Sequence, residues 1–90
     1  MKTYHYLIYG QVQGVCFRQY TVREAEKLGI SGTVRNLPDN SVEVFAQGDD
    51  AEITKFESFL HRGPRSARVE RVVKEVIDDQ REYRGFDISW

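Results

Sequence analysis

Turn residues divide this chain of 90 residues into seven short elements, and the order of the first six constrains the fold more than any other feature. The first element, residues 4–11, is rich in aromatic and branched side chains. Tyr6 and Ile8 fall on one side of it, and Leu7 and Tyr9 fall on the other. This alternation is typical of a strand with two unlike faces.

A helix followed by a hairpin is predicted next. Residues 19–28 carry apolar side chains at helical spacing and precede Gly29, a residue type that commonly ends helices. Strand-like runs cover 31–37 and 41–47, and the residue types at 38–40, Pro-Asp-Asn, suit a tight turn in which asparagine can adopt a positive φ. The apolar positions of the helix are Val22, Ala25 and Leu28.

A second helix is indicated by its start signal and its apolar stripe. Asp49 with Glu52 three residues later forms a capping-box pattern, in which the two side chains would satisfy free N–H groups of the first turn. The stripe consists of Ile53, Phe56 and Leu60.

The final third of the chain is predicted to contain two strands, 67–77 and 86–90, joined by the polar segment 78–85. Alternation slips at Val72 and Val73, where two apolar residues are adjacent. A bulge at this doublet is one way to accommodate it.

The order strand, helix, strand, strand, helix, strand is the split βαβ pattern of ferredoxin-like folds. We therefore expect a single α+β domain over residues 1–90. Two helices should cover one face of an antiparallel sheet, and the final strand should be short. Enzymes, metal carriers and RNA-binding modules all use this fold, so the function must be argued from a site.

Composition excludes several partners. Thirteen basic against fourteen acidic residues give a formal net charge of -1, and no global basic field would attract nucleic acid or anionic lipid. The RNA recognition motif has the same element order, but its basic and aromatic strand signature is absent. The mean hydropathy of -0.57 and the lack of a long apolar run predict no membrane span. Because the N-terminus lacks the apolar stretch of a secretory signal, we expect a cytoplasmic protein. We also expect a monomer.

The junction between the first strand and the first helix, residues 10–18, is the strongest functional signal. Gly10 and Gly14 allow the backbone to bend and to approach a ligand closely. The helix start that follows offers free N–H groups and a positive dipole end, and Arg18 adds a planar cation that stays charged. These features predict a small phosphate-binding loop.

Two segments resemble signatures of the acylphosphatase family. Residues 10–18, Gly-Gln-Val-Gln-Gly-Val-Cys-Phe-Arg, match the family pattern almost completely, and residues 32–36, Gly-Thr-Val-Arg-Asn, match a second one. The turn region 39–43 and the ending 86–90, Phe-Asp-Ile-Ser-Trp, are also similar to the family. The resemblance covers essentially the whole chain.

The resemblance implies hydrolysis of acyl phosphates to a carboxylate and inorganic phosphate, without a metal or cofactor. Arg18 and Asn36 would be the catalytic residues, with Arg18 holding phosphoryl oxygens and the Asn36 amide orienting the attacking water. Inorganic phosphate or sulfate would compete as an anion. The phosphoryl group would be bound through backbone N–H groups of the loop formed by Gln13, Gly14, Val15, Cys16, Phe17 and Arg18.

The same residues also allow other interpretations. A noncatalytic anion-binding module is the main alternative, because acylphosphatase-like domains also occur in hydrogenase maturation proteins. Cysteine phosphatases place five residues between cysteine and arginine, whereas only Phe17 separates Cys16 from Arg18, so the thiol is not expected to act as nucleophile. Arg23 and Arg35 are interpreted as surface charges. No metal site is expected, because His5 and His61 have no ligand-spaced partners.

Overall fold

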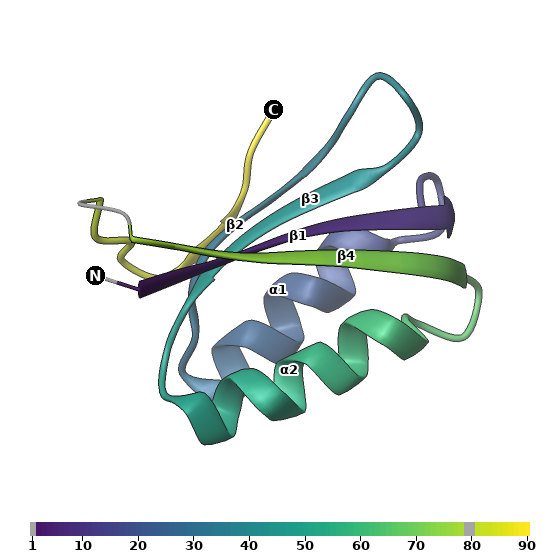
Figure 1. Cartoon of the computed structure of the whole chain (residues 1–90). Helices are drawn as coiled ribbons and strands as arrows, with labels where there is room; N and C mark the ends of the chain where they lie inside the picture. The colour runs from purple at the N-terminus through teal and green to yellow at the C-terminus, as the bar shows by residue number, and fades with distance from the viewer. Residues whose placement is uncertain (1, 79–80) are drawn as a thin grey trace.

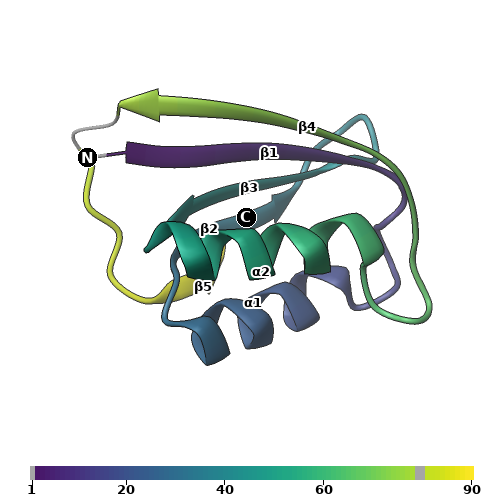
Figure 2. The same cartoon turned by 60° about the horizontal axis from the view of Figure 1, so that its bottom comes forward.

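The computed structural model describes residues 2–78 and 81–90 and folds them into one five-stranded sheet with two helices. Both helices lie on the same side of the sheet (Figure 1, Figure 2), which confirms the predicted ferredoxin-like α+β sandwich. Residues 79–80, part of the expected polar connection, lie outside the described residues. The elements are β1 (Lys2–Gln11), α1 (Phe17–Leu28), β2 (Ser31–Asn36), β3 (Val42–Gln47), α2 (Asp50–Arg62), β4 (Arg68–Asp78) and β5 (Phe86–Ile88).

The strand order β4-β1-β3-β2-β5 places β1 and β3 in the interior of the sheet. β1 pairs antiparallel with β3 and β4, and β2 pairs antiparallel with β3. The predicted antiparallel sheet therefore holds for the four longer strands. β5 adds a parallel pair beside β2, at the sheet edge opposite β4 (Figure 2).

The core lies between the sheet and the two helices. Tyr4, Tyr6 and Ile8 of β1 are buried, whereas Leu7 and Tyr9 are half-buried, so the predicted alternation is confirmed. The buried Tyr6 hydroxyl donates a 2.7 Å hydrogen bond to a Glu57 oxygen, which satisfies it inside the sandwich. The predicted apolar stripes of both helices also face this core, where Ala25, Ile53, Phe56 and Leu60 are buried and Val22 and Leu28 pack at the margin.

The irregularity between β1 and β4 does not lie at the predicted doublet. Val72 and Val73 pair regularly with β1, and the register shifts instead between Tyr9 and Gly10. A Cβ on Gly10 would stand 2.1 Å from the carbonyl oxygen of Arg68. This glycine is therefore required by the close approach of β4 rather than by a ligand. The doublet is tolerated because β4 is an edge strand, on which Val73 is exposed.

The predicted capping box at the start of α2 does not form. Asp49 is the N-cap residue, and its carbonyl accepts the Ile53 amide at 2.9 Å, but its side chain makes no capping hydrogen bond. Glu52 instead pairs with Lys55 along the helix. The carboxylate of Asp50 accepts a 2.7 Å hydrogen bond from the Tyr4 hydroxyl, which fastens the start of the helix to β1.

Gly32 allows β2 to lie close to β3. A Cβ at this position would stand 1.8 Å from the Phe45 carbonyl oxygen, and the residue has a φ of +154°. On the other edge of β2, the Gly32 amide donates a hydrogen bond to the Gly85 carbonyl at 2.9 Å, beside the start of the parallel pairing with β5. Gly32 thus fixes the strand that ends at Asn36 between its two neighbours.

We expect Gly32→Ala to lower the free energy of unfolding by about 3–5 kcal/mol, because the new Cβ overlaps a backbone oxygen that cannot move without distorting β3. Urea unfolding measures the loss. The matched control is Gly29→Ala at the end of α1, where φ is +70° but no atom lies within 4 Å of the added Cβ. The control should lose only about 1 kcal/mol, the cost of the left-handed backbone. Equal losses in the two variants would contradict the close-approach argument.

Candidate active site

The connection between β1 and α1 bends through two left-handed residues. Gly14 has a φ of +74° and Cys16 a φ of +60°, and α1 begins directly afterwards at Phe17, two residues earlier than predicted. Phe17 is buried and packs against Phe59 at a ring-centroid distance of 6.1 Å, which anchors the loop to the core. Cys16 makes no side-chain cap, so its side chain satisfies none of the first amides of the helix.

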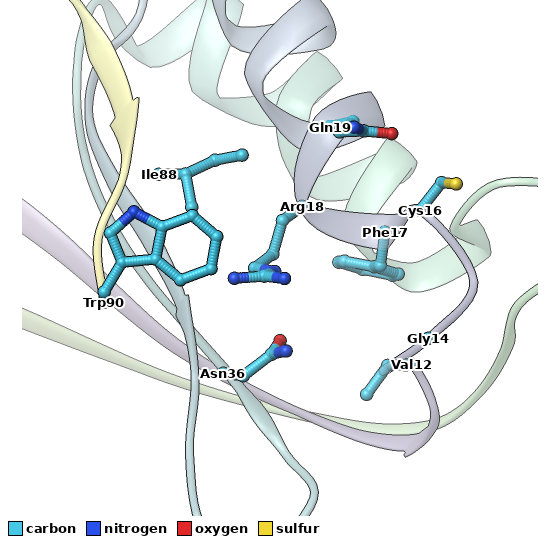
Figure 3. Close-up of a pocket in the computed structure, with 9 residues that line it drawn as sticks. All are labelled: Val12, Gly14, Cys16, Phe17, Arg18, Gln19, Asn36, Ile88 and Trp90. Carbon is cyan, nitrogen blue, oxygen red and sulfur yellow. The ribbon is translucent and has the colours of Figure 1, made fainter.

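An open pocket of about 410 Å³ lies over this helix start. It brings together the loop, the first turn of α1, the end of β2 and the C-terminal segment (Figure 3). The lining residues are Val12, Gly14, Cys16, Phe17, Arg18, Gln19, Asn36, Ile88 and Trp90. Both predicted catalytic residues therefore face one cavity, although they come from different elements.

Arg18 is the charged residue of the pocket lining. Within residues 2–78 and 81–90, no carboxylate forms an ion pair with it. Its Cζ atom lies 4.6 Å from the centroid of the Trp90 ring. A ring stacked on a guanidinium covers its flat face and leaves its in-plane N–H donors available. Arg18 can therefore bind oxyanion oxygens while it stays in contact with the indole.

Asn36 ends β2 and turns its carboxamide toward Arg18 (Figure 3). Its Oδ1 atom is buried and has no hydrogen-bond partner among the described residues. A buried acceptor without a partner costs about 1–3 kcal/mol, and such groups are rare in folded proteins. An orphan acceptor that faces a pocket with an unpaired cation is a sign of a site that binds a ligand or an ordered water.

The side chain of Gln13 points to the β2–β3 hairpin rather than into the pocket. Its Nε2 atom donates to the carbonyl oxygens of Leu37 at 2.9 Å and Ser41 at 2.8 Å. The same hairpin turn contains Asn40 with a φ of +74°, as its residue type predicts. Gln13 thus joins the loop to the turn that follows Asn36.

Val15 and Cys16 take different positions in the loop. Val15 is half-buried and outside the pocket lining, and its carbonyl accepts a 3.0 Å hydrogen bond from the Ser66 hydroxyl. Cys16 is exposed, and its sulfur is turned away from Arg18 and Asn36 (Figure 3). This orientation agrees with the expectation that the thiol is not a nucleophile.

Arg35 is paired on the sheet face away from the helices. Its Nε atom lies 2.7 Å from Glu43, and His5 contacts the other oxygen of the same carboxylate at 2.8 Å. Burial raises the pKa of Glu43, but the hydrogen bonds and charges of His5 and Arg35 outweigh it and hold this pKa below its usual value. Arg35 is therefore a paired structural charge, in line with the sequence interpretation.

Four lining residues were not predicted as site residues: Val12, Gln19, Ile88 and Trp90. Ile88 and Trp90 reach the pocket because β5 pairs parallel with β2, and the Ser89 amide donates to the Val34 carbonyl at 2.8 Å. The aromatic residue at the end of the chain can be read from the sequence, but the pairing of this segment with β2 cannot.

Among residues 2–78 and 81–90, no group of three or more His, Cys, Asp or Glu side chains is placed to hold a metal ion. In the same residues, neither helix is long and apolar enough to cross a membrane.

Comparison with known proteins confirms the family suggested by the two signatures. The acylphosphatase family model matches residues 4–88. An acylphosphatase from Thiobacillus denitrificans is 47% identical over 87 residues, which cover 97% of this chain and 96% of that protein.

Solved structures agree with this match. The acylphosphatase from Bacillus subtilis superposes with a TM-score of 0.95 at 28% identity, covering 100% of both chains. That from Coxiella burnetii gives 0.92 at 34% identity, covering 98% of this chain and 92% of the other. HypF from T. kodakarensis gives 0.88 at 34% identity, but only 12% of its chain is covered. The chain therefore belongs to the acylphosphatase family, a family of hydrolases.

Proposed function

We propose that the protein hydrolyses the carboxyl–phosphate bond of small acyl phosphates in the pocket formed by Arg18 and Asn36. One observation carries the proposal: the orphan Oδ1 of Asn36 faces the same cavity as a guanidinium that has no carboxylate partner among the described residues. Family membership supports the substrate class. The reaction as proposed needs no metal or cofactor.

The phosphoryl group is held by backbone and cation together. The proposed cradle is the N–H groups of residues 13–18, beside the start of α1, and Arg18 binds further oxygens with its in-plane donors. Phosphoryl transfer passes through a loose transition state with charge spread over the equatorial oxygens, so positioned donors supply most of the catalysis. Inorganic phosphate, as the product, and sulfate should compete for the same cradle.

The attacking water is oriented by Asn36. Its Oδ1 accepts a hydrogen bond from the water, which aims an oxygen lone pair at phosphorus. The new P–O bond forms as the bond to the carboxyl oxygen breaks, and the electron pair leaves with the carboxylate. The water proton passes to a phosphate oxygen or to solvent. An amide is no strong base, so the reaction depends on a leaving group that is already good.

A noncatalytic anion-binding module remains the alternative, and the HypF likeness is the observation that favours it, because there the matching segment is a small part of a longer protein. The assays below separate the two, since a binding module would release no phosphate. The monomeric state, the cytoplasmic location and the organisation as one domain stay predictions from the sequence.

Arg18→Ala and Asn36→Ala should each lower kcat/KM for acetyl phosphate by about 100- to 1000-fold, the usual effect of removing a positioned donor to a charged transition state. Phosphate release measures the rate, and circular dichroism checks the fold. Arg23→Ala is the control, because Arg23 lies on the same helix as Arg18, stacks on Tyr20 and does not line the pocket. A rate within threefold of wild type in either site variant would remove that residue from the mechanism.

Acyl phosphates should be hydrolysed in strong preference to phosphate monoesters. An alkoxide leaving group needs a proton donor, and the lining residues nearest the scissile bond in our proposal, Arg18 and Asn36, are a guanidinium and an amide. The test compares acetyl phosphate with glycerol phosphate under the same conditions, with phosphate release as the readout. Comparable turnover of the two compounds would reveal an acid that this mechanism lacks.

Gln13 should act as a positioning residue. Gln13→Ala removes both hydrogen bonds to the hairpin, and we expect kcat to fall by about 10- to 100-fold as Asn36 loses its place, with a smaller change in KM. Gln13→Glu should be no better, because a carboxylate would face two carbonyl oxygens. Faster amide hydrogen exchange in the hairpin turn would accompany the loss.

The matched control is Gln11→Ala, an exposed glutamine at the end of β1. It should change neither kcat nor hairpin exchange. If Gln13→Ala raised KM and left kcat and exchange unchanged, the side chain would belong to substrate binding, and the positioning role would be wrong.

A further inference from the structure

The pocket has two chemically unlike sides. One side is the loop and the first turn of α1, with Gly14 and the Arg18 guanidinium, where the phosphoryl group is proposed to bind. The other side is formed by Ile88 and Trp90 of the C-terminal segment (Figure 3). The proposed reaction uses neither of these two apolar side chains.

Trp90 is exposed to an unusual degree for a tryptophan. Its relative accessibility is 91%, the highest among the large exposed apolar residues of the described chain. The Arg18 guanidinium lies over its ring, with 4.6 Å between Cζ and the ring centroid. A large aromatic surface left in water beside a ligand pocket is unfavourable by itself, and it becomes favourable when an apolar ligand group covers it.

We propose that Trp90 determines acyl-group specificity by providing an aromatic platform for planar aromatic acyl groups, with Ile88 as its neighbour. This inference rests on the proposed function, since it assigns the acyl half of the same substrate. The phosphoryl end binds at the loop and at the in-plane donors of Arg18, and the acyl end extends over the C-terminal segment.

The chemistry of an aroyl phosphate suits this arrangement. Its ring is conjugated with the carbonyl, so ring and carboxyl group are coplanar and present one flat face. A flat face can lie against an indole in offset or edge-to-face geometry, whereas a methyl group covers little of it. Ile88 and Trp90 have no charged side chain, so they offer apolar contacts to the acyl group.

The competing explanation is that Trp90 only holds Arg18 in place through the cation–π contact. The two roles differ in what they do to pairs of substrates. A platform discriminates between acyl groups, whereas a support for Arg18 affects every substrate equally, because all share the phosphoryl group.

The experiment compares benzoyl phosphate with acetyl phosphate in steady-state kinetics of the full chain. For Trp90→Ala, the ratio of kcat/KM for benzoyl to acetyl phosphate should fall by about 3- to 10-fold, the usual contribution of one aromatic contact. Trp90→Phe should restore most of the ratio. The control Tyr20→Ala removes another exposed aromatic ring stacked on an arginine, but outside the pocket, and should leave the ratio unchanged.

A binding measurement makes the test independent of turnover. Trp90 is the single tryptophan of the chain, so its fluorescence reports on this position alone. Phenacylphosphonate and acetonylphosphonate replace the bridging oxygen of benzoyl and acetyl phosphate by a CH2 group and cannot be hydrolysed at that bond. Phenacylphosphonate should change the emission saturably at lower concentration than acetonylphosphonate, and excess inorganic phosphate should reverse the change.

The two measurements together distinguish a platform from a support for Arg18. A lower ratio in Trp90→Ala together with a phosphate-reversible fluorescence change supports the platform. An unchanged ratio overturns the platform. If inhibition by phosphate weakens at the same time, the role of Trp90 is only to hold Arg18 in place. If wild type hydrolyses neither substrate, the proposed function fails, and the fluorescence titration still shows whether aromatic phosphonates bind at Trp90.

Discussion

The antiparallel pairing of β1 with β3 is the constraint on which the site depends. The ladder runs from Tyr4 opposite Ala46 to Ile8 opposite Val42, so the end of β1 lies beside the turn that precedes β3. The loop that continues from β1 and the hairpin that contains Asn36 therefore meet at one end of the sheet. Gln13 extends this contact beyond the last strand pair with two side-chain hydrogen bonds to the hairpin.

Unfavourable features gather at this end of the sheet. Cys16 has a left-handed backbone, the Asn36 oxygen lacks a partner among the described residues, and Trp90 is exposed. The left-handed backbone and the unpartnered oxygen each cost folding free energy, whereas the exposed indole gains none from burial. The buried aromatic and branched residues of the core offset these costs, and two of them, Val12 and Phe17, also line the pocket. Most of the core thus lies in the interior of the sandwich, and the pocket lies at one end of it.

Much of this architecture was predictable because it follows from local pattern. The alternation of β1, the stripes of both helices and the turn at Asn40 each depend on residues that are neighbours in sequence. The two signatures then located Arg18 and Asn36, which line one pocket.

What the sequence missed depends on contacts between distant segments. The direction of β5 follows from a crossing between opposite sheet edges, and it alone brings Trp90 to the pocket. The close approach at Gly10 involves β4, nearly sixty residues away in the sequence. Local pattern therefore predicts ligand binding for a glycine that strand packing requires. The capping box predicted from Asp49 and Glu52 does not form, and the helix start is held instead by Asp50, which accepts a hydrogen bond from the distant Tyr4.

The contact between Arg18 and Trp90 links the two halves of the pocket. In the proposed mechanism, Arg18 offers its edge to the phosphoryl group and its face to the indole, so one side chain would take part in both catalysis and acyl recognition. Residues in contact do not contribute independently, and the effect of changing one depends on the presence of the other. A substrate that stacks on the indole also orders the surface that supports the guanidinium. Binding energy from the acyl group can therefore be used to position the charge that stabilises the transition state, which raises kcat as well as affinity.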